Sequence, residues 1–237
     1  MYKRILIKLS GEALAGNKSN GIIDPEALLN ISKVIKEIAD TGTEICIVIG
    51  AGNICRGSLV EKTGIERVTG DKMGMLGTVI NSFAVANALQ NLQQNAVVLS
   101  AVPMETFTPT YSKEAAEKYF QDGYVVVFGG GTGKPYFTTD TCATLRAIEV
   151  GCDAILIAKN GVDGIYSDDP RYNKDAYMFK EIKCSEIIER NLKVMDLTAV
   201  EMLKDQDIDV RVFNMQNSAN FEKVVRNEPI GTTIMKG

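Results

Sequence analysis

Histidine is absent from this 237-residue sequence, and that absence removes much enzyme chemistry. Without histidine there is no imidazole general base, no Ser-His or Cys-His nucleophile pair, and no metal site that contains histidine. Any catalysis must come from Lys, Arg, Asp, Glu, hydroxyl groups and backbone amides.

Other features are also missing. The five cysteines form no C-x-x-C pair, and their odd number and wide spacing predict reduced thiols, with Cys46 in the core. No charged-then-apolar leader opens the chain and no apolar run approaches the roughly 18 residues of a membrane span, so we expect a cytoplasmic protein with no membrane partner. The formal net charge of −4 indicates no general attraction to nucleic acid. An anion site must therefore be a local cluster of cations and backbone amides.

Apolar runs alternate with amphipathic stretches along the chain. Strands are predicted at residues 2–9, 43–49, 96–102, 124–128, 153–158, 209–213 and 231–235. Helices are predicted from Pro25, with Asp24 as its cap, and at residues 76–93, 112–121, 139–150, 185–191, 197–205 and 218–227. This repetition predicts an α/β fold with a mainly parallel sheet covered on both faces. No long linker or internal repeat interrupts it, so one domain over residues 1–237 is expected.

Residues 129–140 (GGGTGKPYFTTD) form a glycine turn between a predicted strand and a predicted helix. Glycines let backbone N–H groups approach an anion, Thr132, Thr138 and Thr139 offer hydroxyls, and the helix N-terminus adds partial positive charge. The spacing is not that of a Walker A loop, because Pro135 follows Lys134. An anion site is predicted here, and a plain strand-to-helix turn is the alternative.

Further polar loops follow other predicted strands. Lys8 ends the first strand, Arg56 follows the glycine turn at residues 50–53, and Lys159 opens a loop at residues 159–170. Lys8 and Arg56 either contact a phosphate or are solvated surface side chains. Cys55 stands where a dinucleotide fingerprint needs its third glycine, so a Rossmann site is disfavoured. Asp71, predicted just ahead of a helix, either binds a sugar hydroxyl or caps that helix.

Parallel sheets bind ligands at the carboxyl ends of their strands, so these loops should face one crevice. Clustered cations without histidine suit phosphoryl transfer, in which positioning and charge stabilisation do most of the work. A phosphate acceptor has a second pKa of about 6, so its oxygen is already nucleophilic at neutral pH and no general base is needed.

Six motifs together resemble the bacterial uridylate (UMP) kinase family of the amino acid kinase superfamily. They lie at residues 8–13 (KLSGEA), 49–53 (IGAGN, followed by Arg56), 70–75 (GDKMGM), 131–140 (GTGKPYFTTD), 162–166 (VDGIY, followed by Asp169) and 193–197 (KVMDL). The resemblance implies a three-layer α/β/α sandwich and transfer of the ATP γ-phosphoryl group to UMP, giving UDP and ADP in pyrimidine nucleotide (CTP/UTP) biosynthesis. It also implies Mg²⁺ carried by the nucleotide without a direct protein ligand, a homohexamer, and allosteric control by GTP and UTP.

The resemblance assigns roles to matching positions. The residues expected to bind ATP are Lys8, Leu9, Ser10, Gly11, Gly52, Arg56, Asn160, Tyr166 and Asp169. Those expected to bind UMP are Ala51, Asp71, Thr132, Gly133, Lys134, Pro135, Tyr136, Phe137, Thr138 and Thr139, with Asp71 on the ribose. The catalytic candidates are Lys8, Arg56, Asp140 and Asp196, of which the two carboxylates would organise Mg²⁺ or the site lysines. The expected GTP region comprises Gly16, Asn17, Lys18, Ser19, Asn20 and Gly21.

The sequence departs from the family pattern at two places. Ala51 stands where many members have glycine, and a backbone N–H contact survives there if its φ is negative. The loop at Lys159 and Asn160 is one residue longer than in some members, which leaves the roles of these two residues open.

Two other functions remain as alternatives. One is a superfamily member that phosphorylates a carboxylate or carbamate, which the motif combination disfavours. The other is a non-catalytic nucleotide sensor, which would not need to keep transition-state charges such as those of Lys8 and Asp140.

Overall fold

The structure is a computed structural model that describes residues 1–16, 21–55, 63–159 and 161–237. In these residues eight strands form one sheet in the order β3-β4-β2-β1-β5-β7-β8-β6. The strands are β1 (Arg4–Leu9), β2 (Glu44–Ile49), β3 (Ala96–Ser100), β4 (Val125–Gly129), β5 (Ala154–Lys159), β6 (Glu181–Lys183), β7 (Asp209–Asn214) and β8 (Thr232–Met235). All neighbouring pairs are parallel except β7 and β8. The prediction of a mainly parallel sheet is confirmed.

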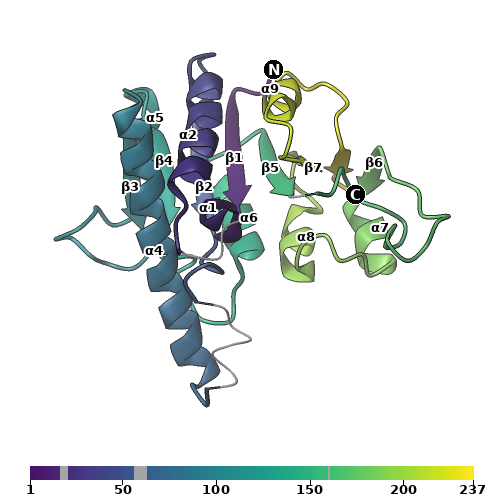
Figure 1. The fold of residues 1–237 in the computed structure, drawn as a ribbon, viewed down its shortest axis with the longest axis horizontal. Helices are drawn as coiled ribbons and strands as arrows, with labels where there is room; N and C mark the ends of the chain where they lie inside the picture. The colour runs from purple at the N-terminus through teal and green to yellow at the C-terminus, as the bar shows by residue number, and fades with distance from the viewer. Residues whose placement is uncertain (17–20, 56–62, 160) are drawn as a thin grey trace.

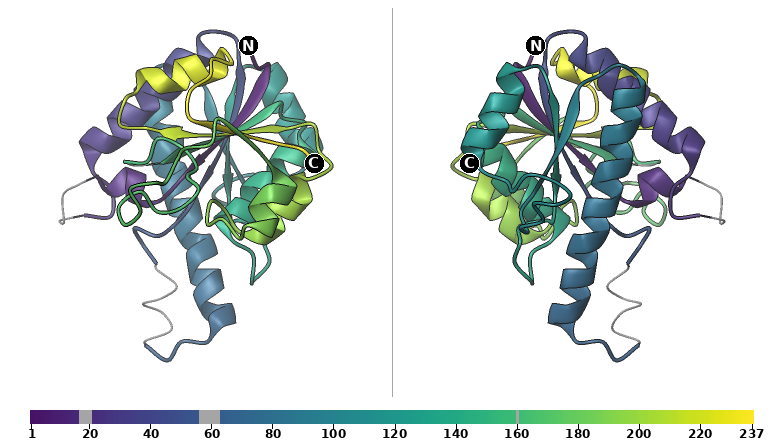
Figure 2. Two further views of the ribbon diagram at one scale, coloured as in Figure 1. Left: turned by 90° about the vertical axis from the view of Figure 1, so that its right-hand side faces the viewer. Right: turned by 90° about the vertical axis from the view of Figure 1, so that its left-hand side faces the viewer.

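Helices cover both faces of this sheet (Figures 1 and 2). One face packs against α2 (Pro25–Ala39), α4 (Arg67–Asn91) and α9 (Ala219–Val225). The other packs against α5 (Lys113–Gln121), α6 (Thr139–Glu149), α7 (Cys184–Glu189) and α8 (Leu197–Leu203). A short helix, α1 (Glu12–Ala15), follows β1 directly. The predicted α/β/α sandwich is therefore present.

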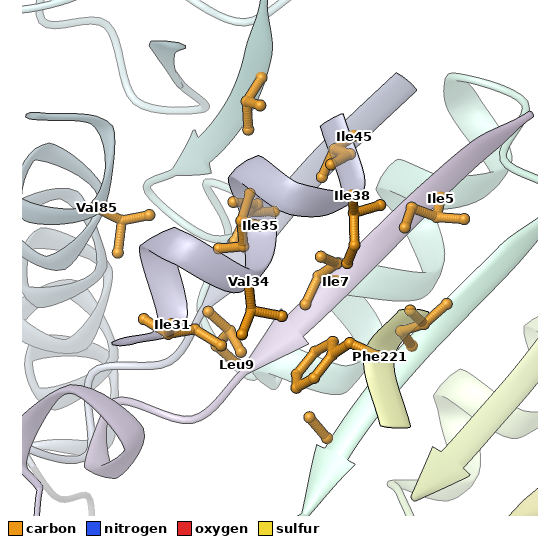
Figure 3. Packing of buried hydrophobic residues seen from close by; sticks show 14 of the residues in the cluster. Ile5, Ile7, Leu9, Ile31, Val34, Ile35, Ile38, Ile45, Val85 and Phe221 are labelled. Carbon is orange, nitrogen blue, oxygen red and sulfur yellow. The ribbon is translucent and has the colours of Figure 1, made fainter. Parts of the chain in front are cut away.

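The central strand β1 divides its side chains between the two layers. Ile5, Ile7 and Leu9 are fully buried beneath α2, where Ile35 packs between them and α4 (Figure 3). Leu6 points to the opposite face and joins the second core cluster. Alternate residues of a strand face opposite sides, so β1 is fixed from both layers. This holds its last residues in a defined place at the sheet edge.

Some boundaries differ from the prediction. Asp24 caps α2 as predicted, accepting the backbone N–H groups of Glu26 and Ala27 at 2.9 and 3.0 Å. Helix α4, however, begins at Arg67, before the predicted start at residue 76. Glycines at positions 70 and 74 each cost about 1 kcal/mol in a helix, but extending an existing helix adds a hydrogen bond per residue. The sequence did not show α1 or β6, which are too short to have a clear periodicity.

Strands β1, β2, β4 and β5 run in the same direction, so their carboxyl ends meet at one edge, toward the bottom of Figure 1. Helix α4 starts beyond that edge and runs back along the sheet. All five cysteines are free thiols, and Cys46 is fully buried, as predicted. Among helices in the part of the chain that the structure describes, none combines the length and apolar character that a bilayer crossing needs.

Candidate active site

Lys8 and Asp140 form an ion pair at the carboxyl edge of the sheet. The Lys8 ammonium lies 2.8 Å from Asp140 Oδ1, and the two side chains are 18% and 20% exposed. Lys8 is held by β1, while Asp140 lies in the first turn of α6, where the helix dipole favours a negative charge. The pair fixes the lysine head group at the point where the first strand meets the glycine loop.

Lys159 is the second lysine at this edge. Lys8 is paired with Ile157 of β5, and residues two apart in a strand share a face, so Lys159 lies just beyond Lys8 on the same side. Its ammonium donates to the Val194 carbonyl at 3.0 Å. Burial lowers the pKa of Lys159, the positive charge of Lys8 lowers that pKa further, and Asp140 raises it. Two lysines thus lie near one carboxylate in a partly desolvated site, and their positive charges favour binding of a polyanion.

Thr138 and Asp196 join α6 to α8. Thr138 Oγ1 accepts the N–H groups of Asp140 and Thr141 at 3.1 and 3.2 Å, which caps α6, and it donates to Asp196. Asp196 also accepts from Thr141 Oγ1 at 2.9 Å and from the N–H of Ala199 at 2.9 Å, which caps α8. Asp196 thus accepts from hydroxyls and an amide, whereas Asp140 pairs with the site lysine.

The glycine loop after β4 turns tightly. Gly130, Gly131 and Gly133 have φ values of 77°, 59° and 73°, in the left-handed region that glycine adopts without strain. Thr132 Oγ1 accepts the N–H of Lys134 at 3.2 Å, which closes the turn locally. The predicted glycine turn between a strand and a helix is confirmed.

Asp71 connects this loop to α4. Its carboxylate accepts from Arg67 Nε at 2.9 and 3.0 Å and from the backbone N–H of Tyr136 at 2.8 Å. Tyr136 has φ 72°, which is unusual for a residue with a side chain. The cap alternative for Asp71 is wrong, because the helix starts earlier and Glu66 occupies the cap position. Asp71 therefore lies beside the loop expected to hold UMP.

The turns after β1 and β2 are packed against each other. A Cβ on Gly11 would lie 2.8 Å from the Gly50 carbonyl oxygen and 2.9 Å from the Gly52 nitrogen, which are backbone atoms, so this position needs glycine. A Cβ on Gly52 would meet the flexible end of the Glu12 side chain. The φ of Ala51 is negative, which meets the condition set for a backbone contact at that position. Asn81 of α4, which sequence reasoning missed, donates to the Gly50 carbonyl at 2.8 Å.

Other predicted site residues lie apart or outside the described residues. Arg56, Asn160 and residues 17–20 are outside them. Tyr166 and Asp169 lie on the segment between β5 and β6. Tyr166 forms a β-bridge with Met178, and Asp169 accepts from Arg171 Nη2 at 2.7 Å. Hydrogen bonds from Arg171 hold the pKa of the Asp169 carboxyl below its usual value.

Comparison with known proteins gives a consistent result. The model of the amino acid kinase family matches residues 3–214. A uridylate kinase of Streptococcus thermophilus (strain ATCC BAA-491 / LMD-9) is 48% identical over 233 residues, which cover 98% of this chain and 95% of that protein. The chain belongs to the uridylate kinases of the amino acid kinase family.

Solved structures of uridylate kinases have the same fold. The structure of UMP kinase from Bacillus anthracis has a TM-score of 0.95 at 40% identity and covers 99% of this chain and 96% of its own. That of UMP kinase from Ureaplasma parvum has a TM-score of 0.93 at 37% identity, with 100% of both chains covered. The family and fold predicted from the sequence motifs are confirmed.

Proposed function

We infer that the chain is an active UMP kinase, which transfers the γ-phosphoryl group of ATP to UMP and gives UDP and ADP. The observation that carries this inference is the Lys8–Asp140 ion pair, with Lys159 beside it, at the N-terminus of α6. Phosphoryl transfer depends on charge stabilisation at the migrating group and on alignment of two nucleotides. A site with two half-buried lysines and no histidine supplies the charge stabilisation without a general base.

The two nucleotides would enter from different sides of this ion pair. ATP is expected at the turn formed by residues 8–11 with Gly52, so that Lys8 neutralises charge on the migrating phosphoryl group. UMP is expected against Ala51, Asp71 and residues 132–139, with its phosphate near the N-terminus of α6, where backbone dipoles favour an anion. Asp140 then serves to hold Lys8 in place. The UMP phosphate oxygen attacks directly because it is already ionised.

Mg²⁺ would arrive with ATP. Asp140 already pairs with Lys8, and Asp196 already accepts from Thr138 and Thr141, so both carboxylates have protein partners. Mg²⁺ commonly keeps several waters and binds phosphate oxygens with few protein ligands, which is compatible with this donor set. When bound, the ion would neutralise charge on the ATP phosphates. Asp140 and Asp196 would act on it through the lysine and the hydroxyls they position.

We also propose that copies of the chain associate through α4. Met73, Leu76, Ile80 and Phe83 follow each other at helical spacing and are 39%, 50%, 54% and 38% exposed. The opposite face of the same helix packs on the sheet, so α4 is apolar on two sides. A second copy is the simplest cover for this stripe, and it is compatible with a homohexamer. We further propose that GTP, bound at residues 16–21, and UTP are allosteric effectors of the enzyme.

A coupled ADP-release assay with ATP and Mg²⁺ tests the proposed reaction. UMP, CMP, dUMP, acetylglutamate and aspartate are offered in parallel, with a Lys8→Ala variant as control. We expect turnover with UMP, which Lys8→Ala largely abolishes while nucleotide binding persists. Turnover with an amino acid alone would place the activity in another branch of the superfamily. Binding of ATP without turnover of any acceptor would indicate a sensor.

A further inference from the structure

Arg146 is a buried cation that the site described above does not use. It lies near the end of α6, and only 4% of its surface is exposed. Its guanidinium carbon is 3.9 Å from the centre of the Tyr111 ring, and its Nη1 is 2.5 Å from Glu149 Oε2. Its Nη2 donates to the Gly131 carbonyl at 3.4 Å. One end of this side chain therefore reaches the glycine loop.

The partners of Arg146 are themselves fixed. The Tyr111 hydroxyl donates to Glu149 at 2.7 Å, and the Tyr111 N–H donates to the Ser100 carbonyl at the end of β3 at 2.8 Å. The Tyr111 ring meets Phe128 of β4 edge-on at 5.2 Å. The guanidinium is therefore held between two strand ends and a helix. The Arg146 side chain is 5% exposed and that of its partner Glu149 is 35% exposed. Burying a guanidinium rarely stabilises a fold more than an apolar residue of the same size would, so a role beyond packing is a hypothesis to test.

The bond to Gly131 bears on the backbone of the loop. A peptide unit is planar, and in its trans form the carbonyl and the following N–H point in opposite directions. If Arg146 holds the Gly131 carbonyl inward, the N–H of Thr132 must point away from the core. Without this hydrogen bond the backbone of Gly131, at φ 59°, would be free to change conformation, because glycine has access to many backbone conformations.

We propose that Arg146 is a positioning residue for the acceptor nucleotide, because it fixes the peptide between Gly131 and Thr132 and so aims a backbone donor at UMP. The proposal rests on the proposed function, in which residues 132–139 hold UMP. It predicts an effect of Arg146 on UMP and little effect on ATP, which is expected at the other side of the Lys8–Asp140 pair.

Arg4 provides a matched control. Like Arg146 it stacks on an aromatic ring, with its guanidinium carbon 4.4 Å from the centre of Phe120, although its side chain is 14% exposed. It also pairs with carboxylates, at 2.7 Å to Glu44 and 2.5 Å to Glu117. Arg4 begins β1, at the amino edge of the sheet and away from the nucleotide loops. Loss of either arginine should cost stability, but only Arg146 should affect UMP.

The test compares Arg146→Lys with Arg4→Lys by steady-state kinetics and thermal unfolding. Lysine keeps the charge but lacks the planar fork and the stacking surface of arginine. We expect both variants to lower the Tm, and Arg146→Lys alone to raise the KM for UMP by about tenfold, with kcat and the KM for ATP changed by less than about twofold. Arg146→Met, if it folds, should show the same pattern.

Two results would overturn the proposal. The first is an unchanged KM for UMP in Arg146→Lys, and the second is an equal rise in Arg4→Lys, which would mark a general effect of instability. An Asp71→Asn variant tests the UMP assignment itself. If Asp71→Asn raises the KM for UMP while Arg146→Lys does not, only the positioning role fails. If neither variant changes it, the assignment of UMP to this loop fails, and the role of Arg146 fails with it.

Discussion

Helix α4 and the turn after β2 touch at Gly77 and Ala51, and this contact gives a quantitative prediction. A Cβ added at Gly77 would lie 2.8 Å from the Cβ of Ala51, an atom that no side-chain rotation can move away because it is bonded directly to Cα. A Cβ added at Gly74, one turn earlier in the same helix, would meet nothing within 4 Å. The two glycines thus differ in surroundings while sharing a helix.

The magnitudes follow from this difference. Replacing a helical glycine by alanine gains about 1 kcal/mol in helix propensity, and we expect Gly74→Ala to realise that gain. Gly77→Ala gains the same amount but overpacks a tight contact, at a cost of about 1–3 kcal/mol, so it should be destabilising by about 1 kcal/mol. For a domain of this size 1 kcal/mol shifts the Tm by about 2–4 °C. The double variant Gly77→Ala/Ala51→Gly removes the clash and should recover most of the loss.

Thermal unfolding of the four proteins at one protein concentration measures these differences, since association would make the Tm depend on concentration. Ala51 is also an expected UMP contact, so the KM for UMP should rise in Gly77→Ala. The reasoning is refuted if Gly77→Ala is as stable as Gly74→Ala, or if Ala51→Gly gives no recovery in the Gly77→Ala background.

Two further predictions concern charge and association. Because the pKa of Lys159 is lowered, it should lose its proton at a lower pH than an ordinary lysine, so kcat/KM should fall as pH rises through that range, and Lys159→Arg should remove this limb of the pH profile. Stability should instead rise with pH there, because the unfolded chain holds that proton more tightly. In sedimentation experiments, Leu76→Glu or Ile80→Glu should reduce the assembly to smaller species. Leu29→Glu, at an exposed position of α2, is the control and should leave the assembly intact. An unchanged assembly in both α4 variants contradicts the proposed interface.

The sequence predicted those parts of the fold that depend on local chemistry. The Asp24 cap with Pro25 was recognisable because both residues act within one turn of the helix. The convergence of Lys8 and Asp140 was expected because parallel strands end at one edge, although the 2.8 Å contact itself needed the structure. The start of α4 was mispredicted because glycines at positions 70 and 74 suggest a turn, and a neighbouring helix can extend through them.

The remaining features depend on contacts between distant segments. Nothing near Arg146 in the sequence shows that Tyr111, from another loop, covers its guanidinium. Asp196 was identified by resemblance, but its bonds to Thr138 and Thr141 join segments far apart in the chain. Asn81 gave the one local signal that was overlooked, since an amide on the apolar face of a helix calls for a partner.

Because the site joins segments that are far apart in the chain, the order of synthesis limits when it can form. Strand β1 leaves the ribosome early, yet one of its two neighbours, β5, begins at residue 154, and the cap on α8 requires residue 196. Until β5 has been synthesised, β1 has one unpaired edge, and unpaired strand edges favour aggregation. A nascent chain that ends before Asp196 cannot form the hydrogen bond between Thr138 and Asp196, so its site is incomplete. Most of the chain must therefore be synthesised before the complete site can form.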